Sequence, residues 1–283
     1  MTDITVVIPC FNGGATLASQ LTALTAQAVE AQFEVLVADN GSTDDTYVVA
    51  SAFADRGVRV IDASSAAGIN VARNAGVRAA DPTSRLFLFC DADDVVRPGW
   101  LAAYWQAYGA GARAMGGALR RVTPSGESLG WRRGLDNSLG FLPWPTGANC
   151  GAAREVFDAV GLFDESFRGG GDETDLFWRA QLGGFDLTYV DGAEIDYTTR
   201  PSASGRFGQR RRFGYSHVRL FASYRAAGMA RRWGPYSLYL LARDLLGSAM
   251  DRRSRDKRDQ LIGDLGLVAG HLAGTVAFRT FYL

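Results

Sequence analysis

Residues 86–94 read Leu86-Phe87-Leu88-Phe89-Cys90-Asp91-Ala92-Asp93-Asp94, an apolar run that leads directly into three carboxylates. An unbroken apolar run of this length is typical of a strand buried on both faces, as in a parallel sheet. The carboxylates then lie at the carboxyl end of that strand, where open α/β sheets bind their ligands. Neighbouring like charges repel one another unless a cation or a hydrogen-bonding ligand offsets the repulsion. The stretch therefore predicts either a metal site or a solvated acidic turn before the helix that starts near Pro98.

Strand-like and helix-like segments alternate along the N-terminal half, which predicts a parallel sheet of βα units. Further strands are expected at residues 4–8, 33–38 and 58–61. Helices are expected around Leu17, Leu21 and Leu24, and over 68–80. The loops that follow the strands should gather at one edge of the sheet, at residues 9–14, 39–46 and 91–94.

Two further residues are candidates for contact with a nucleotide. Asp39 follows the second strand, where it could accept hydrogen bonds from a ribose or a base, or cap the following turn. Arg73 could pair with a ligand phosphate, or with Asp39 or Asp62. No GxGxxG motif follows the first strand and no GxxxxGK[ST] motif occurs in the sequence, which argues against other nucleotide-binding fingerprints.

A second acidic constellation follows three glycines, in the sequence Gly169-Gly170-Gly171-Asp172-Glu173. Glycines let the backbone approach a neighbour closely or adopt positive φ. The acids fall in the first turn of an expected helix, a placement that the helix dipole favours. One carboxylate can therefore cap the helix while the other, facing a cleft, accepts a proton from an attacking hydroxyl.

The loop at residues 143–150 is rich in turn-forming residues and holds an aromatic side chain, Trp144. Trp144 could be a platform on which a sugar stacks or a buried anchor of the loop. We expect an acceptor-side role for Trp144 and keep the buried anchor as the alternative.

Six motifs, in one order and spacing, resemble the family 2 glycosyltransferases with the GT-A fold. They occupy residues 6–17, 35–46, 68–76, 87–94, 146–167 and 169–179. The resemblance implies an α/β fold with a mostly parallel central sheet flanked by helices. It also implies a catalytic domain at residues 1–200, followed by a basic helical extension at 201–283.

The resemblance implies roles for the residues of the donor side. Pro9 and Phe11 would line the nucleotide base, and Asp39 and Arg73 would also contact the nucleotide sugar. Asp91-Ala92-Asp93 would be the DxD motif. Asp91 would lie near the ribose and Asp93 on a divalent cation, Mn²⁺ or Mg²⁺, that bridges the diphosphate. Asp94 is then expected only to cap the chain as it turns toward Pro98.

Two departures from the family pattern concern the base and the metal. The acidic pair of the family is usually Glu-Asp with the second member as base, whereas here the order is Asp172-Glu173. Position favours Glu173 as the base and leaves Asp172 as the alternative. A histidine often follows downstream in the family, and Asp196 stands where we expect it. Because carboxylate oxygens suit Mg²⁺ or Mn²⁺ well, Asp196 is a candidate metal ligand, and a surface aspartate is the alternative.

The resemblance implies an inverting, metal-dependent transfer of a sugar from a UDP-, GDP- or dTDP-linked donor to an acceptor hydroxyl. The acceptor would be a glycan, a lipid-linked molecule or a secondary metabolite. The two departures motivate one alternative, a catalytically inactive nucleotide-sugar-binding module. A sugar nucleotidyltransferase is a weaker alternative, because residues 11–14 lack the basic residue that such a triphosphate loop needs.

Charge is distributed unevenly although the chain is neutral overall. Residues 1–199 hold 14 Arg against 25 Asp and Glu, and residues 200–258 hold 15 Arg and Lys against 3 Asp. The basic segment predicts either an anionic partner, such as a membrane surface, or packing on the acidic part of the same chain. We expect peripheral membrane contact and no nucleic-acid partner.

Helices are expected in the C-terminal third near 213–224, at Tyr236–Met250 and at Leu261–Phe281. Gly266, Gly270 and Gly274 recur every four residues, which permits close packing against a neighbouring helix or against a second subunit in a homodimer. No apolar run without a charge reaches the length of a membrane span. Three distant cysteines and the lack of a signal-peptide pattern predict a cytoplasmic protein, at the inner face of the membrane where it meets lipid.

Overall fold

The computed structural model describes residues 1–199, 203–231, 239, 242–243 and 255–282. The chain divides into two compact units. The first unit comprises residues 1–137, 142–166 and 172–199, and the second comprises residues 138–141, 167–171 and 200–283.

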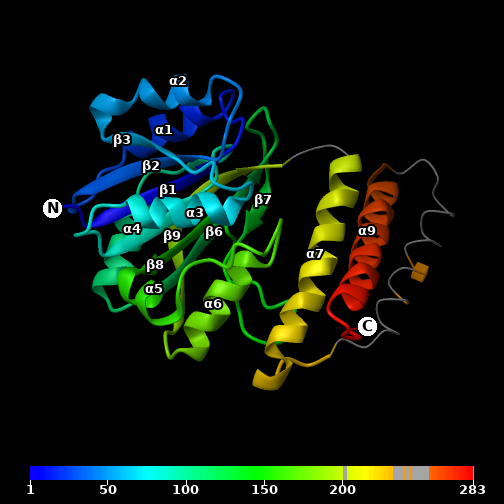
Figure 1. The fold of residues 1–283 in the computed structure, drawn as a ribbon. Coiled ribbons are helices and arrows are strands. Elements are labelled where there is room, and N and C mark those ends of the chain that lie inside the picture. Colours follow the sequence, from blue (N-terminus) through cyan, green and yellow to red (C-terminus); the bar gives the residue numbers. More distant parts are fainter. Residues whose placement is uncertain (200–202, 232–238, 240–241, 244–254, 283) are drawn as a thin grey trace. The chain divides into compact units, whose positions relative to one another are not determined.

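A single mixed sheet forms the centre of the first unit (Figure 1). Its strands are β1 (Ile4–Cys10), β2 (Phe33–Asp39), β3 (Val58–Asp62), β4 (Leu86–Cys90), β5 (Val95–Val96), β6 (Ala114–Val122), β7 (Ser128–Arg132), β8 (Asn149–Ala153) and β9 (Leu187–Thr198). They run in the order β3-β2-β1-β4-β8-β6-β9-β5, and β7 pairs with β6. The first four strands are parallel, as predicted, whereas β8 is antiparallel to both of its neighbours. The carboxyl ends of β1, β2 and β4 consequently meet at one edge.

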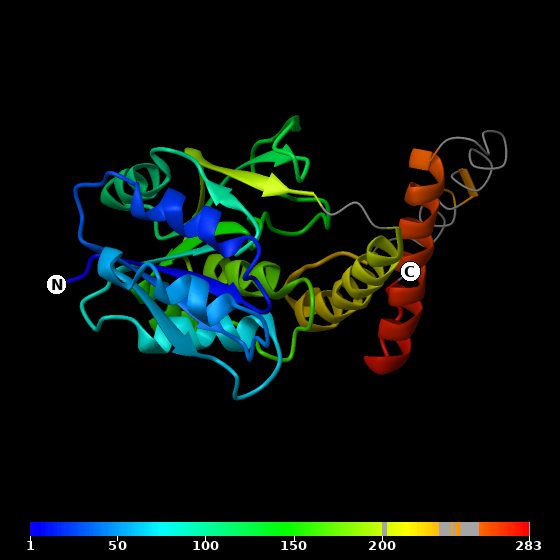
Figure 2. The ribbon, with the colours of Figure 1, turned by 90° about the horizontal axis from the view of Figure 1, so that it is seen from above.

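Helices cover both faces of this sheet (Figure 2). One face carries α1 (Leu17–Thr25), α2 (Thr46–Ser51) and α4 (Trp100–Gly109), and the other carries α3 (Ile69–Ala79), α5 (Arg154–Val160) and α6 (Asp172–Leu182). A short 3₁₀ helix, η1 (Ala54–Arg56), precedes β3. The predicted helix at 68–80 and the helix around Leu17–Leu24 are confirmed.

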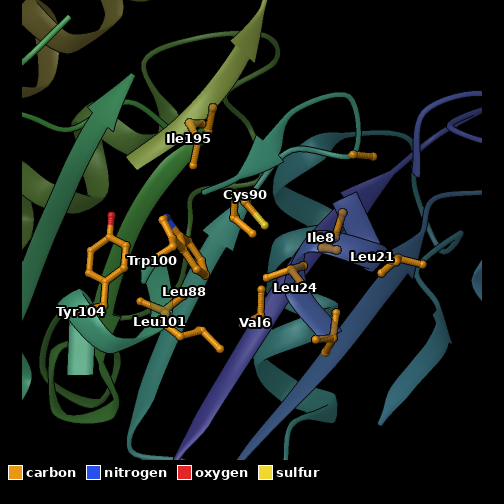
Figure 3. Close-up of a cluster of buried hydrophobic side chains, with 14 of the residues drawn as sticks. Val6, Ile8, Leu21, Leu24, Leu88, Cys90, Trp100, Leu101, Tyr104 and Ile195 are labelled. Atoms are coloured by element: carbon orange, nitrogen blue, oxygen red, sulfur yellow. The ribbon is translucent and has the colours of Figure 1, made fainter. Parts of the chain in front are cut away.

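The side chains of β4 explain why its apolar run is unbroken. Leu86, Leu88 and Cys90 point into the core beneath α1 and α4, which Figure 3 shows in part. Phe87 and Phe89 point into the core beneath α3, α5 and α6. Successive strand residues face opposite sides of a sheet, so a strand covered on both sides must be apolar at every position. The strand predicted from residues 86–90 is confirmed and is completely buried.

Two long helices of the second unit, α7 (Ala203–Tyr224) and α9 (Arg255–Ala277), pack closely together, and a 3₁₀ helix, η2 (Arg225–Ala227), follows α7. A Cβ atom on Gly270 would overlap the carbonyl oxygen of Arg211, and one on Gly214 would overlap that of Leu267. Gly266 likewise lies against Phe207 of α7. The glycine spacing of α9 therefore serves packing against a neighbouring helix of the same chain, and α7 occupies the face expected for a homodimer.

Most of the helix expected at Tyr236–Met250 lies outside the residues that the structure describes; residues 239 and 242–243 are described and are helical. Within the described part of the chain, no helix is both long and apolar enough to cross a membrane.

The contact between α7 and α9 can be tested by adding one methyl group. Alanine favours helix over glycine by roughly 1 kcal/mol, so Gly→Ala should stabilise a helix wherever space allows. We expect Gly270→Ala to lower the thermal midpoint measured by circular dichroism, because its Cβ meets the backbone of α7. Gly208→Ala is the matched control, since its Cβ would find only the side-chain end of Arg212, at 3.6 Å. An equal rise of the midpoint in both variants would show that the helices are not in close contact at Gly270.

Candidate active site

The donor-side residues named from the sequence lie at the carboxyl edge of the parallel strands. Pro9 is buried within β1, which runs two residues further than expected, to Cys10. Phe11 follows in the next loop with 64% of its surface exposed, so its ring is accessible for stacking. Asp39 ends β2, pairs in register with Cys10, and accepts a hydrogen bond from the Ser42 amide at 2.9 Å. Its capping role is therefore present in the structure, and its second oxygen remains as an acceptor for a ligand.

The acidic loop after β4 gathers three carboxylates. One oxygen each of Asp91, Asp93 and Asp94 lies within 4.8 Å of the others, and Ala92 between them is buried. Asp94 is only 2% exposed and accepts a hydrogen bond from the Thr198 amide at 2.9 Å. Asp94 thus ties the loop to the end of β9, instead of merely capping the turn toward Pro98 as expected.

Two glutamines that were not selected from the sequence hold this loop in place. Gln20 donates to the carbonyl of Asp91 at 3.1 Å and accepts from the amide of Val96 at 2.9 Å. Gln27 donates to the carbonyl of Arg97 at 3.0 Å. Gln20 lies on α1 and Gln27 lies two residues after its end, so α1 and the turn after it hold the loop at Asp91, Val96 and Arg97. Gln20 lies three residues after Leu17 and four before Leu24, on the apolar face of the expected helix, and a glutamine on such a face was the available signal.

Arg73 of α3 connects the two acidic parts of the site. Its side chain is 2% exposed, and it donates hydrogen bonds to the carboxylate of Asp172 and, at 3.2 Å, to the carbonyl of Gly147. The carboxylate of Asp91 lies 4.0 Å away, and the guanidinium carbon lies 5.2 Å from the ring centroid of Phe163. The partners expected for Arg73 within the chain were Asp39 or Asp62, and the structure shows Asp172 and Asp91 instead.

The charges around Arg73 keep it protonated. Burial alone would lower the pKa of Arg73, but the carboxylates of Asp172 and Asp91 outweigh burial and raise the pKa of Arg73 above its ordinary value. A buried cation is stable only when such partners offset its desolvation. Arg73 is therefore a permanent positive charge between the loop after β4 and the start of α6.

The two members of the acidic pair have different surroundings. Asp172 is 3% exposed and pairs with Arg73, whereas Glu173 is half-buried. Burial, together with the negative charge of Asp172, raises the pKa of Glu173 to about 8, and Arg73 opposes this only in part. A carboxyl group with a pKa near neutral can hold a proton and release it, as a general base must.

Asp196 is held by two arginines. It lies on β9, and its two carboxylate oxygens accept hydrogen bonds from Arg120 at 2.7 and 2.6 Å. Arg97 lies 3.3 Å from the same carboxylate. Among the described residues, the group of carboxylates close enough to share a cation is Asp91, Asp93 and Asp94, without Asp196. A cation at Asp196 would have to displace a bidentate guanidinium, so the structure favours a structural ion pair.

Trp144 is the buried anchor, and the acceptor-side platform expected for it is not what the structure shows. The side chain is 8% exposed and meets Trp178 edge-to-face, with ring centroids 5.9 Å apart. Its backbone pairs with Asp136 across a short antiparallel bridge. The indole faces are therefore not available to a sugar.

Asn149 at the start of β8 is a third residue that was not selected from the sequence. Its side-chain oxygen accepts from Trp100 and Tyr104, both at 2.8 Å, and its nitrogen donates to the carbonyls of Ala118 and Ala193 at 3.0 and 2.8 Å. All hydrogen-bonding positions of the amide are thereby used in a site without solvent exposure. Asn149 joins α4, β6 and β9 beside the end of β4 and so fixes the floor beneath the acidic loop.

The central position of Arg73 predicts a large effect on stability. Arg73→Met should lower the free energy of unfolding by about 3–5 kcal/mol, because it leaves the buried charge of Asp172 without its partner. Urea unfolding measures this loss. Arg78→Met on the same helix is the control: Arg78 is 60% exposed in its pair with Glu165, and such pairs contribute below about 1 kcal/mol. Adding Asp172→Asn to Arg73→Met should recover part of the loss, and strictly additive losses would contradict the pairing.

A family comparison agrees with this geometry. The family model described as "Glycosyl transferase family 2" matches residues 5–159, more than half of the chain. Glycosyltransferase AglE of Haloferax volcanii is 26% identical over 210 residues, which cover 70% of this chain and 67% of AglE.

Solved structures show the same fold. The mannosyltransferase PcManGT from Pyrobaculum calidifontis, in complex with GDP-Man and Mn²⁺, superposes with a TM-score of 0.65 at 17% identity, over 97% of this chain and 89% of that one. TarS 1–349 of S. aureus in complex with UDP-GlcNAc gives a TM-score of 0.60 at 18% identity, over 93% of this chain and 79% of that one. This chain spans 39% of the TarS chain in another crystal structure. The fold is therefore the GT-A fold of glycosyltransferases, and the chain belongs to glycosyl transferase family 2.

Proposed function

We propose that this protein is an inverting glycosyltransferase that moves a sugar from a nucleotide-diphosphate sugar to an acceptor hydroxyl by metal-assisted direct displacement. One observation carries the proposal: a carboxyl group of raised pKa, Glu173, lies beside Asp172, which the buried Arg73 links to the acidic loop after β4. A group able to take a proton and a group of carboxylates able to hold a cation are thus joined through one buried charge.

The donor would bind at the carboxyl edge of β1, β2 and β4. Phe11 offers an exposed ring for the base, Asp39 offers an acceptor for a base or ribose, and Pro9 is buried in β1 two residues before Phe11. Carboxylate oxygens within 4.8 Å of one another fit a hard divalent cation, so Asp93 would hold Mn²⁺ or Mg²⁺ with Asp91 toward the ribose. When bound, the cation stabilises the charge that gathers on the leaving diphosphate. The GDP-Man, Mn²⁺ and UDP-GlcNAc named for the two solved relatives support this class of donor.

Glu173 would be the base. Its carboxylate removes the proton of the acceptor hydroxyl as that oxygen forms a bond to the anomeric carbon. The bond to the diphosphate oxygen breaks on the opposite side, so the anomeric configuration inverts. Asp172 is engaged by Arg73 and would instead raise the proton affinity of its neighbour. The surroundings of the two residues thus support Glu173 in the reversed pair.

The acceptor is suggested by charge. Arg206 and Arg211 are exposed on α7, within the segment where basic residues far outnumber acidic ones. Such a surface attracts an anionic acceptor or the anionic membrane in which a lipid-linked acceptor lies. We therefore favour a lipid-linked or polyanionic acceptor presented at a membrane surface over a neutral soluble one.

The metal assignment predicts a difference between two aspartates. A nucleoside diphosphate at one hundred times its dissociation constant stabilises its binding protein by ~2.7 kcal/mol, which a thermal shift detects. With Mn²⁺ present, one of UDP, GDP and dTDP should raise the midpoint of the wild type and of Asp196→Asn. Asp93→Asn should lose this Mn²⁺-dependent shift. Loss of the Mn²⁺-dependent shift in Asp196→Asn alone would identify Asp196 as the metal ligand. The absence of a shift with any of the three diphosphates would contradict the donor site.

The base assignment predicts a pH profile. Glu173 must be deprotonated to act, so kcat/KM should rise with pH through an apparent pKa of about 8 and then level off. Glu173→Gln should lower kcat by about 10²–10⁴-fold with nucleotide binding retained. Asp172→Asn should move the rise to lower pH, because it removes the adjacent negative charge. Nucleotide binding without turnover on any acceptor would instead identify a nucleotide-sugar-binding module.

A further inference from the structure

The segment that leads into the acidic pair has an unusual backbone. Gly169, Gly170 and Gly171 have φ values of 87°, 131° and 80°, a region that residues with side chains rarely adopt. Glycine loses more conformational freedom on folding than any other residue, so three in succession weaken a segment unless something holds it. This segment and α7 belong to the same compact unit.

Residues 167–171 are held by one face of α7, which begins at Arg212. A Cβ atom on Gly170 would lie 2.5 Å from the ring of Phe213, and one on Gly171 would lie 3.0 Å from the side chain of Ser216. The glycines therefore allow the chain to pass against the helix at a distance that no side chain would permit. Positions 212, 213, 216 and 219 recur at helical spacing and form one continuous face.

A cation–π contact fixes the other end of the segment. Phe167 is 3% exposed, and the guanidinium carbon of Arg219 lies 3.8 Å from its ring centroid. A guanidinium over the face of an aromatic ring is attracted by the ring electrons, and more strongly when the contact is desolvated. Arg219 and Phe213 thus hold the segment at both ends, directly before the peptide bond to Asp172.

We propose that Phe213 and Arg219 are positioning residues for the acidic pair: by holding residues 167–171 against α7, they set where α6 begins and therefore where Asp172 and Glu173 stand. The inference rests on the proposed function, in which Glu173 is the base. A displacement of about 1 Å at a reacting group can reduce a rate by two orders of magnitude, so even a small shift of the helix start matters.

Phe213→Leu and Arg219→Gln test the proposal, with two matched controls. Phe207→Leu makes the same change where α7 meets α9, and Arg225→Gln removes an exposed charge just beyond α7. We expect both test variants to lower kcat by about 10–100-fold, with the dissociation constant of the nucleoside diphosphate and Mn²⁺ changed by less than about twofold. The controls should keep the kcat of the wild type. Equal losses of kcat in tests and controls would overturn the proposal.

A second readout does not depend on activity. The chain has seven glutamates, so ¹³C-carboxyl labelling of glutamate gives few signals, and the one absent in Glu173→Gln belongs to Glu173. Glu173 is faced by Asp172 and Arg73, with Cys150 nearby, so its titration reports how close these groups stand. In the test variants, the pKa of Glu173 should lie closer to that of an ordinary glutamate than in the wild type, because a loosened start of α6 admits water.

The two readouts separate the proposals. If the wild type transfers sugar to no acceptor, the proposed function has failed, and the titration still decides whether α7 positions the pair. If the test variants lower only the thermal midpoint and leave the titration of Glu173 unchanged, Phe213 and Arg219 are merely structural and the positioning role is wrong.

Discussion

A guanidinium group buried among carboxylates is the interaction on which the candidate site depends. Without Arg73, the loop after β4 and the start of α6 would bring the charges of Asp91 and Asp172 near one another in a poorly solvated place. Burial of a charge without a partner costs several kcal/mol, so neither the cation nor the anions would be stable there alone. Because α3 supplies the cation and two other parts of the chain supply the anions, the site is complete only where all three parts meet.

The fold and the donor edge could be predicted because their signals are local. A strand covered on both faces must be apolar throughout, and parallel strands bring their carboxyl ends to one edge, so residues 86–94 were informative without knowledge of any neighbour. The ion-pair partners of the charged residues, in contrast, could not be predicted from the sequence. Arg120 reaches Asp196 through the parallel pairing of β6 with β9, and that pairing shifts register at Gly117 and Ala118. An irregularity of this kind leaves no pattern in a single sequence.

Long-range contacts also explain why the surroundings of other site residues could not be predicted from the sequence. The residues next to Trp144 in the sequence are compatible both with a sugar platform and with a buried anchor. Only the packing of Trp178 on α6 against its ring decides between the two. Gln20 and Asn149 act through main-chain atoms or side chains far away in the sequence. The order of the acidic pair was visible from the start, but the division between an aspartate held by Arg73 and a glutamate of raised pKa depends on burial, which no spacing encodes.

The clamp formed by Gln20 and Gln27 has a consequence for how this site can evolve. The course of the acidic loop is specified from outside, by amide groups on α1 and the turn after it that bind main-chain atoms. At the proposed cation site, an exchange of Asp91 or Asp93 would therefore alter the ligand atoms more than the course of the loop. Asp94 is the exception, because its carboxylate holds the amide of Thr198 and a change there would move the framework itself.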